Sequence, residues 1–136
     1  MGAIILPSHR IAKEFARFHD MLRRVFNYLL ESAWPERADL FITSIYRSKR
    51  EDEAVGGGGI HHSIPHRACD IRVHPLTDGE RVTIVTRLNR RFSYDPQRPK
   101  LPVAICDQHG TAPHLHLQAS DFTVEHNGAP PAEDSE

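Results

Sequence analysis

The sequence predicts an α+β fold, in which a small antiparallel sheet is flanked by helices within a single domain over residues 1–126. Two stretches carry apolar residues at helical spacing, and four short stretches are rich in β-forming residues. The helical and strand stretches are separated by turn-forming residues. Helices that are segregated from antiparallel strands are typical of this class, and 136 residues suffice for one modest core.

The first helix is predicted over residues 9–32, with Ser8 as its N-cap and Trp34-Pro35 at its end. Its apolar residues recur in steps of three and four, at Ile11, Phe15, Phe18, Leu22, Val25, Phe26 and Leu29. A β-rich stretch at 39–46 then predicts the first strand.

Four consecutive glycines, 56–59, precede the second predicted strand at 67–73. No Gly-Lys-Ser/Thr follows them, so we interpret them as a flexible loop that carries His61 and His62 rather than as a nucleotide-binding loop. Because strand side chains alternate, Asp70 and Arg72 are expected on one face of the second strand and Cys69 on the other.

The second helix is predicted over 78–92, capped by Thr77. Its expected apolar stripe comprises Val82, Val85, Leu88 and Phe92. A proline-rich turn at 95–99 leads to a third strand at 101–106, and a turn at 107–110 leads to a fourth strand that contains His114 and His116. Residues 127–136 are rich in Gly, Ala, Pro and acidic residues and are expected to be disordered.

The overall composition is that of a soluble globular protein. With 17 basic and 18 acidic residues, the net charge of −1 argues against nucleic-acid binding and against attraction to an anionic membrane. No apolar run approaches the ~20 residues of a membrane span, and the N-terminus lacks a basic leader, which predicts synthesis in the cytosol. The two cysteines, Cys69 and Cys106, are expected to be buried thiols.

A metal site is the chemistry that the histidine pattern favours. His114 and His116 are separated by one residue of a predicted strand, so both project from one face. A catalytic zinc takes three protein ligands, and Asp70 on an adjacent antiparallel strand could join His116. The third ligand would come from an upstream cluster, namely His61, His62 and His66.

Several of these residues also have ordinary interpretations. Asp70 could cap a turn or pair with Arg67 or Arg72, and Arg47 could be an exposed strand-end arginine. The remaining histidines are expected to be surface or hydrogen-bonded residues: His9, His19, His74 and His126.

The order of four segments resembles the zinc D-alanyl-D-alanine carboxypeptidase family, which includes phage L-alanyl-D-glutamate endolysins. The segments are 42–48 (Ile-Thr-Ser-Ile-Tyr-Arg-Ser), 54–57 (Ala-Val-Gly-Gly), 67–70 (Arg-Ala-Cys-Asp) and 114–116 (His-Leu-His). This family belongs to a group of peptidoglycan metallopeptidases that also contains lysostaphin-like enzymes and the hedgehog zinc domain. The resemblance therefore implies a hedgehog-like or D-Ala-D-Ala-peptidase-like fold.

The resemblance also implies roles for individual residues. Asp70 and His116 would be zinc ligands, and His114 would be the general base or would stabilise the tetrahedral intermediate. Arg47 would bind the substrate carboxylate or the developing oxyanion, because a guanidinium forks onto two oxygens and stays charged. Ser48, next to it, would also lie in the substrate-binding segment.

The chain departs from the family pattern at the first histidine ligand. The family has histidine seven residues before the aspartate, and that position here is Ser63. A one-residue shift in the loop would let His62 bind the metal, which is the interpretation we favour. His66, four residues before Asp70, is the second choice because lysostaphin-like enzymes have that spacing, and His61 is the third.

A second departure is Pro113, which stands where many carboxypeptidase members have a glutamate three residues before the last zinc histidine. Proton transfer would then fall on His114, with His109 or Asp107 as neighbours. The prediction is a monomeric zinc peptidase that cleaves a D-Ala-D-Ala or L-Ala–D-Glu amide of peptidoglycan by attack of a metal-bound water. Such an enzyme could reach the cell wall through holin-made holes. The alternative is a non-catalytic zinc- or peptide-binding module, such as a phage structural component of the same fold.

Overall fold

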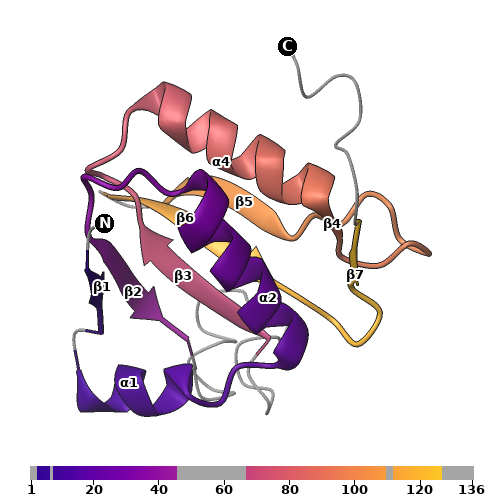
Figure 1. Ribbon diagram of the computed structural model, residues 1–136, viewed down its shortest axis with the longest axis horizontal. Coiled ribbons are helices and arrows are strands. Elements are labelled where there is room, and N and C mark those ends of the chain that lie inside the picture. The colour runs from indigo at the N-terminus through magenta and orange to yellow at the C-terminus, as the bar shows by residue number, and fades with distance from the viewer. Residues whose placement is uncertain (1–2, 7, 46–66, 110–111, 127–136) are drawn as a thin grey trace.

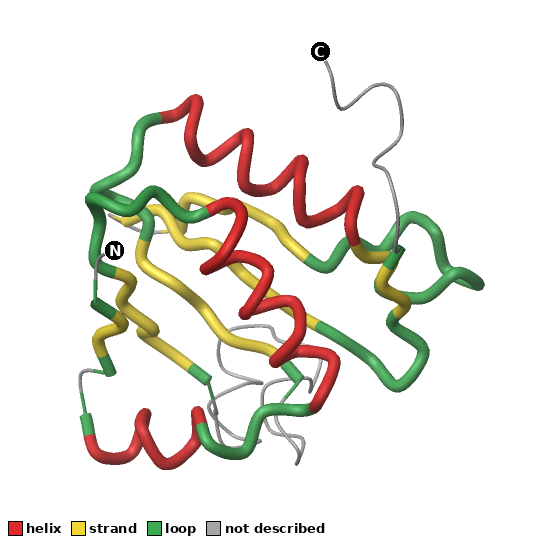
Figure 2. Tube along the Cα trace, in the orientation of Figure 1, coloured by secondary structure: helices red, strands yellow, loops and turns green. Residues whose placement is uncertain are grey.

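The computed structural model describes residues 3–6, 8–45, 67–109 and 112–126, and the structural statements below concern these residues. The predicted tail at 127–136 lies outside them. The elements, shown in Figures 1 and 2, are β1 (Ile4–Ile5), α1 (His9–Phe15), α2 (Asp20–Tyr28), the π-helical turn η1 (Leu29–Ala33), β2 (Leu40–Ser44), β3 (Ala68–Arg72), α4 (Asp78–Arg91), β4 (Phe92–Ser93), β5 (Ala104–His109), β6 (Ala112–Gln118) and β7 (Val124–Glu125). No helix in these ranges has the length and apolar character needed to cross a bilayer.

The main sheet has five strands in the order β1-β2-β3-β6-β5. The pairs β2–β3, β3–β6 and β6–β5 are antiparallel, whereas β1 pairs in parallel with β2. The predicted α+β class is confirmed, but the prediction of a purely antiparallel sheet is wrong because β1 adds a parallel edge. Leu40 donates its backbone N–H to Ala3, and Ala3 donates to the carboxylate of Asp39, which together hold β1 in place.

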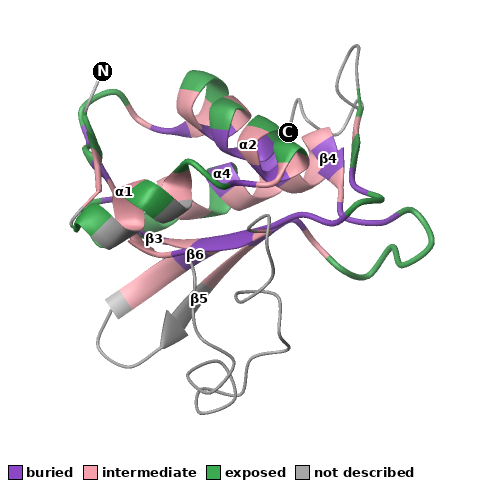
Figure 3. Ribbon diagram, turned by 90° about the horizontal axis from the view of Figure 1, so that it is seen from below, coloured by how far each residue is buried: buried purple, intermediate pink, exposed green. Residues whose placement is uncertain are grey.

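Helices α2 and α4 lie side by side on one face of this sheet, as Figure 3 shows. Between the helices and the strands lies one apolar core, whose largest fully buried side chains are Phe26, Phe92, Leu22, Leu29, Leu40, Ile42, Ile45, Ile71, Ile84, Leu88, Leu115 and Leu117. Among the described residues, no helix covers the opposite face of the sheet, which we call the open face.

The predicted single helix at 9–32 is interrupted. Helix α1 begins after Ser8, whose hydroxyl accepts from the Ile11 N–H as predicted, but it ends at Phe15. Arg23 donates to the Phe15 carbonyl at 2.6 Å, and His19 caps α2 by accepting from the Met21 N–H through Nδ1. These two side chains satisfy backbone groups that a continuous helix would have paired internally, so the break is stable.

Helix α4 begins as predicted and packs differently from the prediction. Thr77 and Glu80 form a reciprocal capping box. The buried stripe, however, is centred on Ile84 and Leu88, and Val82 is 64% exposed. The helix ends at Arg91, so Phe92 belongs to β4. The apolar spacing alone allowed two neighbouring stripes, and the approach of α4 to β5 selects the one that contains Ile84.

The third predicted strand lies three residues later than expected, because β5 spans Ala104–His109. Its first residues are held by Asn89 of α4, whose Oδ1 accepts from the backbone N–H groups of Val103 and Ala104. The Asn89 amide in turn donates to the Ala104 carbonyl at 2.9 Å. The Asn89 side chain thus pairs with backbone groups as a neighbouring strand would, and it holds the segment that leads into β5.

Candidate functional site

Strand β6 divides its side chains between the core and the open face. Leu115 and Leu117 are buried beneath the helices, with exposed fractions of 1% and 0%. Because strand side chains alternate, His114, His116 and Gln118 project from the open face. The predicted common orientation of the two histidines is therefore confirmed.

Asp70 and His116 form the centre of the open face. They lie directly opposite each other in the antiparallel β3–β6 pair, which confirms the predicted juxtaposition. Asp70 Oδ1 lies 2.9 Å from His116 Nδ1, and the two side chains are 21% and 23% exposed. An imidazole nitrogen and a carboxylate oxygen are thus held together where solvent and a ligand can reach them.

The donor atoms of this pair fit zinc. Imidazole nitrogen and carboxylate oxygen both bind zinc at about 2.0–2.2 Å, so neighbouring ligands of a tetrahedral site lie about 3.3 Å apart. The observed 2.9 Å is close to that spacing, and a small rotation of Asp70 would provide the rest. The pair can therefore contribute two of the three ligands of a catalytic zinc site.

A hydrogen-bond chain continues from His116 away from Asp70. His116 Nε2 lies 3.0 Å from Gln118 Oε1, and Gln118 Nε2 donates to the Pro102 carbonyl at 2.8 Å. The sequence interpretation missed Gln118, although the alternation His-X-His-X-Gln already placed it on the same face. No sequence pattern predicts that the Pro102 carbonyl accepts from Gln118, because this contact depends on how the segment before β5 packs.

His114 and Arg72 occupy the neighbouring register position. They lie opposite each other in the β3–β6 pair, one step along from Asp70 and His116. Arg72 is exposed, and its guanidinium lies 5.2 Å from the centre of the Phe41 ring on β2. Within the described part of the chain, no hydrogen bond occupies either ring nitrogen of His114.

A β-bulge lies beside Asp70. In the β2–β3 pair, Ile42 faces Ile71 and Ser44 faces Asp70, so Thr43 is an extra residue on β2. The Thr43 hydroxyl lies 3.3 Å from the Asp70 carbonyl, to which it donates. Bulges bend the strand that carries the extra residue, and here the irregularity lies on β2, directly beside Asp70.

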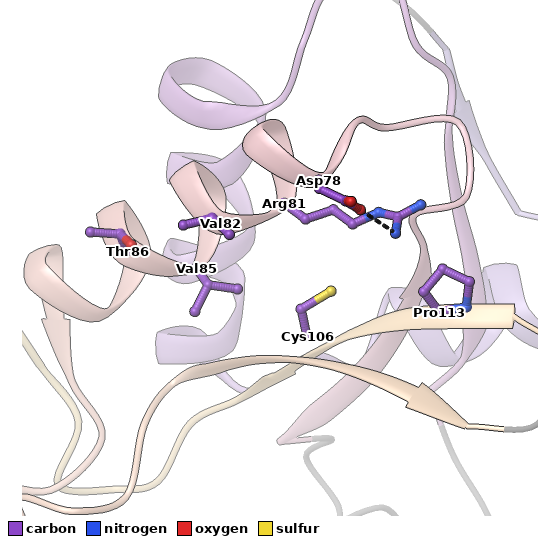
Figure 4. Close-up of a pocket in the computed structure, with 7 residues that line it drawn as sticks. All are labelled: Asp78, Arg81, Val82, Val85, Thr86, Cys106 and Pro113. Atoms are coloured by element: carbon purple, nitrogen blue, oxygen red, sulfur yellow. Dashed lines mark hydrogen bonds and ion pairs between the residues drawn. The ribbon is translucent and has the colours of Figure 1, made fainter.

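Pro113 lies on the other side of the sheet from these groups. It lines a cavity of about 410 Å³ beneath α4, shown in Figure 4, together with Cys106 of β5 and Val82 of α4. In a regular strand, residues three apart face opposite sides, so position 113 cannot serve His116. A glutamate there would point toward α4, and its replacement by proline leaves no gap at the Asp70–His116 pair.

Five predicted site residues lie outside the described residues: Arg47, Ser48, His61, His62 and His66. The side chains of Asp107 and His109 are also outside the description, although Asp107 faces His114 in the β5–β6 register. Within the described ranges, no three His, Cys, Asp or Glu side chains gather around one point. The structure thus brings Asp70, His114 and His116 to one face and leaves the third metal ligand among the three upstream histidines as a prediction.

The other four described histidines are surface or hydrogen-bonded residues, as predicted. His19 and His126 are hydrogen-bonded, to Asp121 and Ser93, and His9 and His74 are exposed. Hydrogen bonding from His19, together with the charges of Arg67 and His19, outweighs desolvation and lowers the pKa of Asp121.

The two cysteines differ in their surroundings. Cys69 is fully buried on the core side of β3, as predicted, and burial raises the pKa of its thiol, with a further contribution from the charge of Asp70. Cys106 is only half-buried, in the wall of the cavity beneath α4, so its predicted burial is only partial.

In comparisons with protein-family models, curated proteins and solved structures, nothing matches this chain. The resemblance to zinc peptidases therefore depends on the motif residues of the sequence.

Proposed function

We propose that this protein is a zinc-dependent peptidase that cleaves an amide bond of a peptidoglycan peptide, of the D-Ala-D-Ala carboxypeptidase or L-Ala–D-Glu endopeptidase type. The observation that carries the proposal is the Asp70–His116 pair at 2.9 Å on the open face, with His114 two residues from His116 on the same strand face. The peptidoglycan substrate and the hedgehog-like fold group come from the family resemblance.

Asp70 and His116 would hold the metal together with one upstream histidine. His62 is the favoured third ligand, followed by His66 and His61. When bound, zinc would supply an activated water and would polarise the carbonyl of the scissile amide. The protein's own contribution is to hold a carboxylate and an imidazole on paired strands, where the sheet keeps both in position.

His114 would move the proton. Its ring lies on the same strand face as His116 and has no hydrogen-bond partner in the described part of the chain. It would accept a proton from the attacking water and deliver it to the leaving amine. Arg47 and Ser48 are assigned to the substrate by resemblance, and Arg72 is a second cation that stands opposite His114.

Two observations favour a non-catalytic zinc- or peptide-binding module as the alternative. Ser63 stands where the family has its first histidine ligand, and both ring nitrogens of His116 already have partners within the protein. Both functions predict bound zinc, so metal content alone does not separate them.

The decisive experiment compares peptide release with zinc content. Protein purified without chelator would be incubated with purified peptidoglycan from several wall types, and released fragments identified by mass spectrometry. The wild type should release peptides, and His114→Ala should keep its zinc but lose at least about 100-fold in rate. His74→Ala, at an exposed histidine, is the matched control and should retain full activity.

Two results would overturn the peptidase proposal. A wild type that holds one equivalent of zinc and releases nothing from any wall would favour the binding module. A zinc content below about a tenth of an equivalent would instead indicate that the open-face histidines serve only in hydrogen bonding.

A further inference from the structure

We infer that Gln118 is a positioning residue, which fixes the hydrogen of the His116 ring on Nε2 and so directs the Nδ1 lone pair at Asp70 as a metal ligand. The inference rests on the proposed zinc site and adds a residue and a physical task to it. The task is the choice between the two tautomers of one imidazole.

The orientation of the Gln118 amide is determined by Pro102. Gln118 Nε2 lies 2.8 Å from the Pro102 carbonyl oxygen, which can only accept hydrogen bonds. The amide nitrogen must therefore occupy that side. The amide oxygen, Oε1, is left facing His116 Nε2 at 3.0 Å.

The amide oxygen then determines the tautomer of the histidine. An amide oxygen accepts and never donates, so His116 Nε2 must carry a hydrogen to make this contact. A neutral imidazole has a single N–H group. The other ring nitrogen, Nδ1, consequently presents a lone pair, and it faces Asp70 Oδ1 at 2.9 Å.

A lone pair and a carboxylate oxygen repel each other unless a positive centre lies between them. That centre is either a second ring proton or a metal cation, and a cation satisfies both donor atoms at once. The opposite tautomer, with Nδ1–H donating to Asp70, would make a stable pair without metal. Gln118 disfavours that tautomer, because it would leave two acceptors face to face at Nε2.

Gln118 is held firmly enough for this task. Its side chain is buried, with the residue 8% exposed, and its backbone N–H donates to the Val103 carbonyl at 2.9 Å. Pro102 precedes the Val103–Ala104 segment that Asn89 holds through three hydrogen bonds. The Pro102 carbonyl, the Gln118 amide and the His116 imidazole therefore form one ordered chain of contacts that ends at Asp70.

The test reads the tautomer and the metal affinity separately. Nitrogen-15 NMR of the metal-free protein, recorded near pH 8.5, well above the ordinary histidine pKa of about 6.5, reports which ring nitrogen of His116 carries the hydrogen. Zinc affinity is measured by competition with a chromophoric chelator. Gln118→Met removes the acceptor at similar size and should lose the Nε2–H preference and about 10–100-fold in zinc affinity.

Two further variants separate positioning from a general loosening of the fold. Gln118→Glu keeps an oxygen that can accept from His116 Nε2 but loses the N–H group that donates to the Pro102 carbonyl, so the preserved property should be the Nε2–H tautomer. Glu125→Gln weakens the contacts of β7 with α2 and α4, away from Gln118 and His116, and should leave both readouts at their wild-type values.

A wild-type tautomer and zinc affinity in Gln118→Met would overturn the inference, as would an equal loss in Glu125→Gln. If the wild type bound no zinc, the zinc site and the ligand role of Nδ1 would both fall. The NMR comparison of the wild type with Gln118→Met would still decide whether Gln118 selects the tautomer.

Discussion

Asp70 Oδ1 and His116 Nδ1 lie 2.9 Å apart although 46 positions separate the two residues in the chain. The antiparallel register of β3 and β6 sets this separation, because the two residues are directly opposed in the ladder. The contact is therefore built on the most regular part of the fold. A pair of this kind changes little when a loop moves, which suits a metal site that must keep its geometry.

Removal of the Asp70 charge should abolish tight zinc binding. Asp70→Asn preserves the size of the side chain but replaces an anionic ligand by a weak neutral one. We expect zinc affinity to fall by more than about 100-fold, beyond the 10–100-fold typical of residues that only support a ligand. Competition with a chromophoric chelator measures the loss. Asp78→Asn is the control, because its carboxylate is 99% exposed, and a similar loss there would contradict the assignment.

Arg72 should contribute to recognition of a substrate carboxylate. It is exposed on the open face opposite His114, and a guanidinium can bind a carboxylate through two hydrogen bonds. Arg72→Ala should raise KM for a peptide with a terminal carboxylate by about 10-fold or more, with a smaller effect on kcat. The same peptide with an amidated end should show no difference between wild type and variant. An equal effect on both peptides would exclude this role.

Glu125 should stabilise the fold at neutral pH and lose that effect in acid. Its carboxylate accepts from Arg24 of α2 and Arg91 of α4, so it joins β7 to both helices. Burial alone would raise its pKa, but the hydrogen bonds and charges of the two arginines outweigh burial and lower it. The stabilisation is therefore complete above the ordinary glutamate pKa of about 4.3 and disappears as the pH falls through the lower pKa of the folded state.

Glu125→Gln should accordingly reduce the free energy of unfolding by about 1 kcal/mol near neutral pH. The difference from wild type should shrink as the pH falls below about 4.3, where the unfolded chain takes up the proton first, and should vanish below the lower pKa of the folded state. Urea unfolding across a pH series measures both values. Glu36→Gln, at an exposed site, should show no pH-dependent difference. A constant difference at every pH would indicate a packing effect in place of an electrostatic one.

The two thiols should differ sharply in reactivity. Cys69 is fully buried, and its raised pKa keeps it protonated, whereas only the thiolate reacts with disulfide reagents. We expect Ellman's reagent to label Cys106 in the folded protein and Cys69 only after denaturation. Mass spectrometry of the labelled peptides identifies the site. Fast native labelling of Cys69 would show that the core side of β3 opens readily.

Elements with a strong local pattern could be predicted from the sequence. The second predicted strand, at 67–73, corresponds to β3 at Ala68–Arg72, and Thr77 caps α4 through a capping box that its neighbours already encode. The break between α1 and α2 could not be predicted, because it depends on Arg23 and His19 binding backbone groups across the turn. Strand β1 is too short to show any periodicity.

The same distinction applies to the site. The shared face of His114 and His116 follows from local alternation, and their proximity to Asp70 follows once β3 and β6 are paired. The placement of Pro113 in the wall of a cavity on the other face is the main difference from the family pattern. The family resemblance makes position 113 a missing acid, whereas the strand alternation places it on the face opposite Asp70 and His116.

The alternation in β6 determines which substitutions and which changes of length this strand can accept during evolution. Substitutions at His114 or Gln118 alter the chemistry of one face and leave Leu115 and Leu117 in the core, so the two faces can vary independently. An insertion or deletion of one residue within Ala112–Gln118 would instead turn the leucines outward and the histidines into the core. We therefore expect insertions and deletions in the connections on either side of β6, whereas β6 itself should keep its length of seven residues.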